Sequence, residues 1–190
     1  MNAWERVESE LTAATERARS LDDSTPARLF TVRPALTQWS AAECIAHLSV
    51  STEMFLPVLR RVLDDARNRH LSGNGDPHMD VLGRILRWFL EPPVRTRIKT
   101  TAAFVPKSIR AKSEALAEFA ALQTQLTDLL RSANDLPIGK LKITSPFDSR
   151  VKYNVYSGFL ILAAHQRRHL WQAEQAVAAL RRGQTTDQLP

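Results

Sequence analysis

The sequence predicts an all-α protein, a four-helix bundle with long connecting loops and one short extra helix. Four long segments place apolar residues at steps of three and four, which is the period of one buried helix face. No segment shows a convincing strand alternation. Apolar residues make up 44% and charged residues 24% of the 190 residues, an ordinary composition for one globular domain over residues 1–190.

The first helix is predicted over residues 4–21, where Asp22 to Pro26 end its apolar stripe. Residues 26–39 read as a loop. Ser40 and Glu43 then form a capping box, in which each residue satisfies a backbone N–H of the other. The second helix follows to about residue 69, and Pro57, which lacks an N–H, should kink or locally break it.

The remaining helices are separated by two long connections. Residues 72–77 form a turn, and residues 81–90 are the short extra helix. Residues 91–109 have no clear period, which is typical of a functional or mobile loop. The other predicted elements are a helix over 113–132, a connection over 134–152, and a last helix from about 154 to 182 with Gly183 as its C′ residue. Connections this long argue against simple up-down-up-down hairpins.

Composition excludes several classes of function. No apolar run reaches the roughly 18 residues of a membrane helix, and residues 1–11 lack a signal-peptide core, so we expect a cytoplasmic protein with no membrane partner. The single cysteine, Cys44, excludes zinc sites built from cysteine pairs. The net charge of +6 permits an anionic partner. The basic stretches lack interleaved aromatics, however, and no nucleic-acid partner is predicted.

Three histidines form a candidate metal site. His165 and His169 are four apart on the inward stripe of the last helix, so both rings project from one face. His47 lies on the inward stripe of the second helix. Three neutral imidazoles can hold one divalent transition metal, with zinc and nickel among the candidates, and leave a position open for water or substrate.

A second interpretation remains open for these histidines. Buried histidines can also be core residues that are hydrogen-bonded separately. The pair is not a zinc-protease motif, because Gln166 follows His165 where that motif needs a glutamate as general base.

The two histidine segments resemble a known family. Residues 39–48, Trp-Ser-Ala-Ala-Glu-Cys-Ile-Ala-His-Leu, and residues 165–172, His-Gln-Arg-Arg-His-Leu-Trp-Gln, are similar to the DinB/YfiT-like superfamily of bacterial proteins. The resemblance spans residues 31–180 and implies a four-helix bundle, often a homodimer. It also implies a metal site of three histidines, matched here by His47, His165 and His169.

The resemblance also implies a choice of functions. Characterised relatives include S-transferases and isomerases that use bacillithiol, mycothiol or glutathione, and other relatives look like metal-dependent hydrolases. We therefore expect a small-molecule transferase with a low-molecular-weight thiol cosubstrate, or a hydrolase. The alternative is a non-catalytic stress protein that binds a metal or small molecule.

Several further residues have two interpretations. Arg167, Arg168 or loop arginines such as Arg95 and Arg97 could hold the carboxylates of a thiol cofactor. Arg167 and Arg168 could instead be exposed helix residues. Glu43 could orient His47, but its capping role already explains it. We expect Cys44 to be a buried apolar residue and Trp39 to pack at the start of its helix. His70 and His78 should lie on the surface. Glu53 and Tyr153 are candidates to line a pocket.

Overall fold

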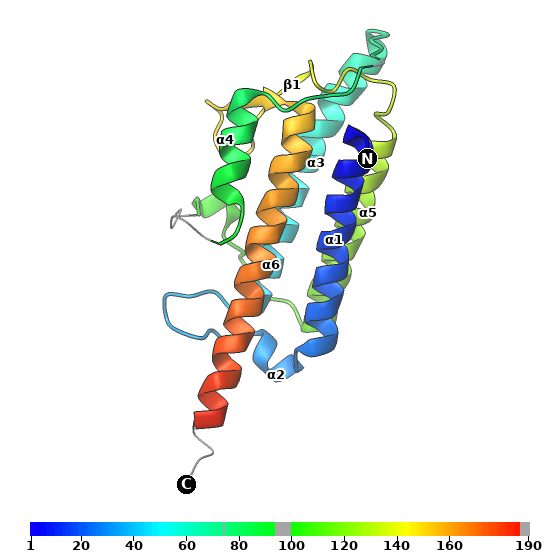
Figure 1. The fold of residues 1–190 in the computed structure, drawn as a ribbon. Helices are drawn as coiled ribbons and strands as arrows, with labels where there is room; N and C mark the ends of the chain where they lie inside the picture. Colours follow the sequence, from blue (N-terminus) through cyan, green and yellow to red (C-terminus); the bar gives the residue numbers. More distant parts are fainter. Residues whose placement is uncertain (74, 94–99, 187–190) are drawn as a thin grey trace.

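The computed structural model describes residues 1–73, 75–93 and 100–186, and within them four long helices form a bundle (Figure 1). These helices are α1 (Ala3–Ser24), α3 (Ala41–Asn68), α5 (Lys112–Arg131) and α6 (Val155–Thr186). The predicted all-α bundle is confirmed. The predicted short extra helix is α4 (Val81–Leu90), which packs against α6 on the outside of the bundle.

The long helices do not alternate in direction. α1 and α6 run down the view of Figure 1, whereas α3 and α5 both run up it. The chain therefore has to return from the end of α3 to the start of α5, and residues 69–111, which include α4, make this return. This agrees with the prediction that the long connections rule out a simple up-down-up-down bundle.

Small elements occupy segments that we expected to be irregular. The predicted loop at 26–39 contains the one-turn helix α2 (Ala27–Phe30), and the connection at 91–109 contains the 3-10 turn η1 (Ala102–Phe104). β1 (Lys142–Thr144) and β2 (Lys152–Asn154) pair antiparallel, with Ile143 opposite Tyr153. We predicted a connection without strands at 134–152, and this was wrong. Three-residue strands are too short to show an alternation in the sequence.

Two local predictions within helices differ from the structure. α3 continues through Pro57, so the predicted local break is absent. A proline leaves unpaired the carbonyl four residues earlier. Here that residue is Glu53, which is exposed like Pro57, so water can reach this part of the helix. α6 likewise continues past Gly183 to Thr186, and no glycine among the described residues has a positive φ, so Gly183 is not a left-handed C′ residue.

Side-chain caps fix the starts of α1, α3 and α4. The predicted capping box of Ser40 and Glu43 is present at α3, and Asn2 and Glu5 form another at α1. Asp80 caps α4 by accepting a hydrogen bond from the backbone N–H of Gly83. Each cap satisfies N–H groups that a helix start leaves without partners.

A polar layer divides the buried core in two. One apolar cluster includes Val155 to Ala163 of α6, and the other includes Leu170 to Val177. Between them lie His165, Gln166 and His169, which are all buried. The bundle therefore places its buried polar chemistry halfway along α6.

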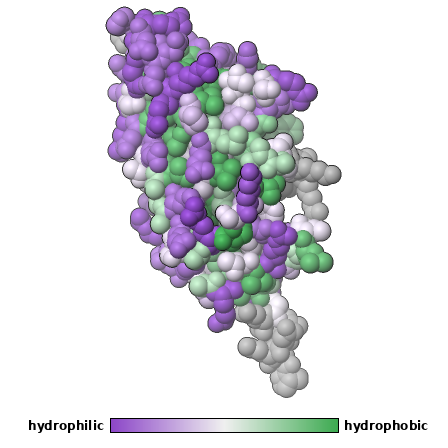
Figure 2. Space-filling view, turned by 180° about the vertical axis from the view of Figure 1, so that it is seen from behind, coloured by the Kyte–Doolittle hydropathy of each residue, from purple (hydrophilic) through white to green (hydrophobic). Residues whose placement is uncertain are grey.

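The surface is mostly polar at one end. In Figure 2, hydrophilic side chains crowd the top of the molecule, where α3 ends. Hydrophobic side chains reach the surface lower down on this face. None of the described helices combines the length and the apolar composition of a membrane span.

Candidate metal site

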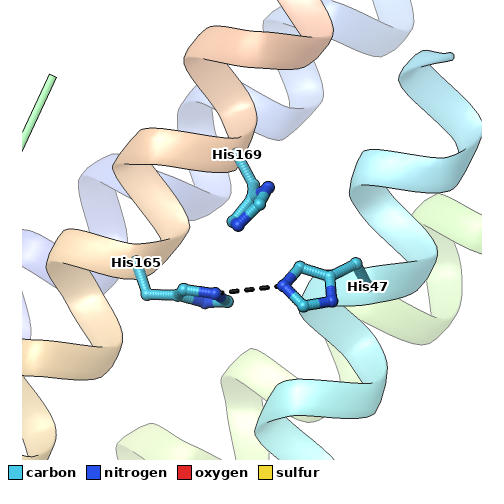
Figure 3. Close-up of side chains that lie close together, drawn as sticks. All are labelled: His47, His165 and His169. Atoms are coloured by element: carbon cyan, nitrogen blue, oxygen red, sulfur yellow. Dashed lines mark hydrogen bonds between the residues drawn. The ribbon is translucent and has the colours of Figure 1, made fainter. Parts of the chain in front are cut away.

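The three predicted histidines meet in the polar layer. His47 extends from α3, and His165 and His169 extend from successive turns of α6, so that the rings point toward one another (Figure 3). One ligand nitrogen from each ring can be chosen so that all three lie within 4.8 Å of one another. Only 2%, 5% and 8% of the surfaces of His47, His165 and His169 are exposed, so the cluster is enclosed by protein.

The tautomer of His47 follows from its hydrogen bond. Its Nδ1 lies 2.7 Å from the backbone oxygen of Phe104, and a carbonyl oxygen can only accept, so Nδ1 carries the proton. Its Nε2 then has a free lone pair, which points toward His165. A carbonyl that fixes the outer nitrogen in this way is the usual partner of a metal-binding histidine.

The spacing of the imidazoles fits one shared ion. Nε2 of His47 and Nε2 of His165 are 3.1 Å apart. Two nitrogens bound to one tetrahedral zinc ion at 2.0–2.1 Å stand about 3.4 Å apart, so little movement is needed. Nδ1 of His165 and Nδ1 of His169 are buried without a hydrogen-bond partner among the described residues. The interpretation as separately hydrogen-bonded core histidines therefore leaves polar atoms unsatisfied.

The electrostatics keep all three rings neutral. Burial lowers the pKa of His47 despite its bond to Phe104. Burial also lowers the pKa of His165 and of His169 well below the ordinary value, and nearby positive charge, including Arg168, lowers both further. A neutral imidazole has the lone pair that a metal needs. The cluster is therefore ready to bind a cation near neutral pH.

Aromatic side chains from three connections enclose the cluster. Trp39 lies 5.1 Å from the His47 ring, measured between ring centroids, and 5.9 Å from the His169 ring. Phe147, from the turn between β1 and β2, lies 5.2 Å from the His165 ring and 4.5 Å from Phe104. Trp39 thus packs at the start of α3, as predicted, but it also forms one wall of the site.

The two arginines of the α6 motif occupy different environments. Arg167 forms ion pairs with Glu10 of α1 and with Glu91 just after α4. Arg168 is only 4% exposed and donates a hydrogen bond to the backbone oxygen of Phe89 over 3.1 Å. Neither is an exposed helix residue, which corrects that alternative. Their role in holding a cofactor stays a prediction.

The other candidate residues are distributed around the site. Glu43 bonds Ser40 and forms an ion pair with Arg33, so it acts as the cap and has no bond to His47. Burial raises the pKa of Glu43, but its bonds to Arg33 and Ser40 outweigh this, and the pKa is lowered overall. Cys44 is fully buried among apolar residues, and burial raises the pKa of its thiol.

The expected pocket and surface residues can also be placed. Glu53 lines a cavity of about 250 Å³ between α3 and residues 103–110. Tyr153 is buried in the apolar core, and burial raises the pKa of its hydroxyl to about 12. His70 and His78 are exposed, as expected. The basic loop residues Arg95 and Arg97 lie outside the described part of the chain.

Sequence reasoning missed the groups that surround the histidines. The carbonyl of Phe104 leaves no trace in the sequence, because every residue has one. Phe147 lies in a connection without period. The amides of Gln123 and Gln166 hydrogen-bond each other across α5 and α6, at 2.6 and 3.2 Å, in the same polar layer. Their inward positions in two helices were the one available signal.

Comparison with known proteins gives a family match. The family model of the DinB superfamily matches residues 10–173, which includes all three histidines. A search of the curated proteins and a search of the solved structures each give no match.

Proposed function

Because the chain belongs to the DinB superfamily, we propose that it binds one divalent transition metal through His47, His165 and His169 and acts with it on a small molecule. The observation that carries this proposal is the convergence of three buried, neutral imidazoles from two helices. Zinc and nickel suit three imidazoles of this kind.

The proposed reaction is transfer of a low-molecular-weight thiol, or hydrolysis. A metal bound here would lower the pKa of a thiol or water at its open position and so supply a nucleophile near pH 7. The chain itself orients His47 through the Phe104 carbonyl and excludes bulk water with Trp39, Phe104 and Phe147. Gln166 is bonded to Gln123 and supplies no base.

Arg168 is the first candidate to bind the carboxylate of a thiol cosubstrate. It is buried, and its charge is close enough to lower the pKa of both His165 and His169. Arg167 is the other candidate, and it forms ion pairs with Glu10 and Glu91. Arg168→Gln should therefore raise the KM for the thiol at least as much as it lowers kcat.

The near-complete burial of the histidines favours a second candidate function. A site so enclosed suits a protein that holds a metal or a small molecule without turnover. This is the non-catalytic alternative. Metal binding by the protein without consumption of any thiol or hydrolysable substrate would support it.

Metal content is the first experiment. Purified wild-type protein and the variants His47→Ala, His165→Ala and His70→Ala are offered zinc or nickel near neutral pH, freed of excess metal, and measured by elemental analysis. We expect about one ion per chain in wild type. The exposed-site control His70→Ala should keep that ion, and the other two variants should lose it. A wild-type protein without metal would refute the proposal.

Thiol transfer is measured next. The metal-loaded protein is mixed with bacillithiol, mycothiol or glutathione and with an aryl halide, so that sulfur displaces the halide as the new C–S bond forms. We expect loss of free thiol that stops when a chelator is added. Metal binding without thiol loss or hydrolysis would leave the non-catalytic function.

A further inference from the structure

A cleft of about 660 Å³ lies over the first turns of α6, between α1 and α4. Figure 1 shows α4 and α1 on either side of α6 in the upper part of the view. Tyr156 and Leu160, one turn apart on α6, line the floor of the cleft, and Arg6 of α1 and Trp88 of α4 line its two walls. Small-molecule sites typically have volumes of about 300–1,000 Å³, so the cleft has the size of such a site.

The cleft is separate from the histidine cluster. Tyr156 and His165 are nine positions apart on α6, and so are Leu160 and His169. Nine positions are about two and a half turns of an α-helix, so the members of each pair point to opposite sides of α6. His47, His165 and His169 are not among the residues that line the cleft. A ligand in the cleft would therefore occupy a second site.

Polar contacts join the two walls at both ends of the cleft. At one end the Asp76 carboxylate accepts a hydrogen bond from the backbone N–H of Ala3 over 3.1 Å. At the other end Arg87 of α4 forms ion pairs with Glu10 of α1 and with Glu91. These contacts connect α1 to the segment that carries α4, so they fix the distance between the two walls.

The lining of the cleft has an excess of positive charge. Three arginines and two carboxylates line it. Arg84 is exposed and has no acidic partner among the residues that the structure describes. The guanidinium of Arg6 lies 3.6 Å from Oε1 of Glu10, an oxygen that Arg87 binds more closely, over 2.8 Å. Arg84 and Arg6 can therefore bind an anion that enters the cleft.

The floor of the cleft offers a hydrogen-bond donor beside an apolar surface. Tyr156 is only 4% exposed, and within the described part of the chain its hydroxyl has no hydrogen-bond partner. Burial raises the pKa of Tyr156, so the hydroxyl keeps its proton near neutral pH and can donate a hydrogen bond. Leu160 beside it is apolar, and the indole of Trp88 is half-exposed on the wall. Aromatic rings pack favourably against tyrosine and tryptophan.

We propose that this cleft binds a small aromatic anion, such as an aryl carboxylate. Arg84 and Arg6 would bind the anionic group, and the Tyr156 hydroxyl would donate a hydrogen bond to it. The aromatic ring would lie over Leu160 and against Trp88. This binding uses none of the three histidines and needs no metal, so its test is independent of the proposed function.

A fluorescence titration of the full chain with 8-anilinonaphthalene-1-sulfonate, an aromatic anion, tests this proposal. We compare wild type with Arg84→Gln, with Tyr156→Phe and with Arg60→Gln, which removes the same charge at an exposed position of α3. We expect saturable binding by wild type, with a dissociation constant about tenfold weaker for Arg84→Gln and about threefold weaker for Tyr156→Phe, because bonds between charged groups are the stronger ones. Arg60→Gln should match wild type, and circular dichroism should show all variants folded.

Two matched competitors test the requirement for an anion. The ligands 2-naphthoate and 2-naphthamide share one ring system, but only the carboxylate is charged. The carboxylate should displace the fluorescent probe from wild type about tenfold more effectively than the amide does, because it alone pairs with the arginines.

The variants also locate the bound probe. Exposed apolar side chains on the other side of α4, including Ile85, are a second place where an aromatic probe can bind. Binding there would not change in Arg84→Gln or Tyr156→Phe. Equal affinity of all four proteins for the probe would therefore overturn the proposal. Equal displacement by the two competitors, or no saturable binding by wild type, would overturn it as well.

Discussion

At the scale of single residues, the buried histidine cluster lowers the stability of the metal-free fold. Three imidazoles are held neutral within a bundle whose other layers are apolar. A buried polar atom without a hydrogen bond costs about 1–3 kcal/mol, and Nδ1 of both His165 and His169 has no partner among the described residues. The cluster therefore carries a polar cost that apolar side chains at the same positions would not carry.

The neutral histidines should make the metal-free protein acid-sensitive. Their pKa values are lowered in the folded state, so below about pH 6.5 the unfolded chain binds protons that the folded chain does not. The free energy of unfolding should therefore fall between pH 7.5 and 5.5, by up to about 1.4 kcal/mol per pH unit for each such histidine. Urea unfolding at the two pH values measures this.

A variant with all three histidines changed to Gln should lose most of this pH dependence. The exposed-site variant His70→Gln should keep it. Most carboxylates titrate below pH 5.5 and add little in this window. An equal decline in the triple variant and in wild type would show that other groups cause the acid sensitivity.

The buried amide pair allows a double-mutant test. Gln123 and Gln166 satisfy each other, and Gln123 also donates to the Leu11 carbonyl over 3.1 Å. Gln166→Leu alone should destabilise the protein by roughly 1–3 kcal/mol, because it leaves the Gln123 amide partly unpaired. Gln123→Leu should then cost less in the Gln166→Leu variant than it costs in the wild-type protein. Urea unfolding of the four proteins gives the coupling energy, and strict additivity would contradict the pair.

The residues of the cluster were predictable, and their surroundings were not. Histidine is rare enough that a spacing of four on an inward stripe is informative, and His47 follows a recognisable helix start. The partner of His47 is a backbone carbonyl 57 residues away, and the partners of Arg167 come from α1 and from the end of α4. Such contacts depend on how the connections fold back, which local patterns do not encode.

At the scale of elements, Asp80 holds the short helix in place. Its carboxylate caps α4 and accepts hydrogen bonds from Lys142 of β1, the backbone of Asn154 of β2 and Ser157 of α6. Burial raises the pKa of Asp80, but the bonds from Lys142, Gly83 and Asn154 outweigh this, so the pKa lies below its ordinary value. One carboxylate thus connects α4, the hairpin and α6.

We therefore expect Asp80→Ala to destabilise the protein by roughly 1–3 kcal/mol, because it removes the cap and leaves donors unpaired. Thermal and urea unfolding measure the change. Asp148→Ala is the matched control and should cost much less, because among the described residues the Asp148 carboxylate pairs with the neighbouring Arg150 alone, at the surface. Equal losses for the two variants would show that Asp80 does not join the elements.

Helices were predicted well, and their interruptions were not. The five predicted helices are present because their apolar period of about 3.6 residues extends over several turns. The hairpin was missed because its strands have three residues each, and α3 continues through Pro57 where both Pro57 and Glu53 are exposed. Single breakers predict the ends of elements poorly when tertiary packing continues on either side.

At the scale of the whole molecule, the site joins distant parts of the chain. His47 and His165 are 118 residues apart, and the parallel course of α3 and α5 places the long return connection beside the cluster. The topology explains why the wall of the site comes from loops. It also means that a bound ion would crosslink α3 to α6 across the polar layer that divides the core.

Metal should therefore stabilise the entire fold, in proportion to its affinity. An ion that binds only the folded chain adds about 2.7 kcal/mol at a free concentration of 100 times its dissociation constant. A protein of this size gains about 2–4 °C in Tm per kcal/mol, so zinc or nickel should raise the Tm by roughly 5–10 °C. Differential scanning calorimetry measures the shift with and without chelator.

His78→Ala, an exposed-site control, should show the same rise in Tm. His47→Ala and His169→Ala should show little rise, because either change leaves too few ligands between the two helices. A rise that survives His47→Ala would place the ion elsewhere in the chain and would separate the histidine cluster from metal binding.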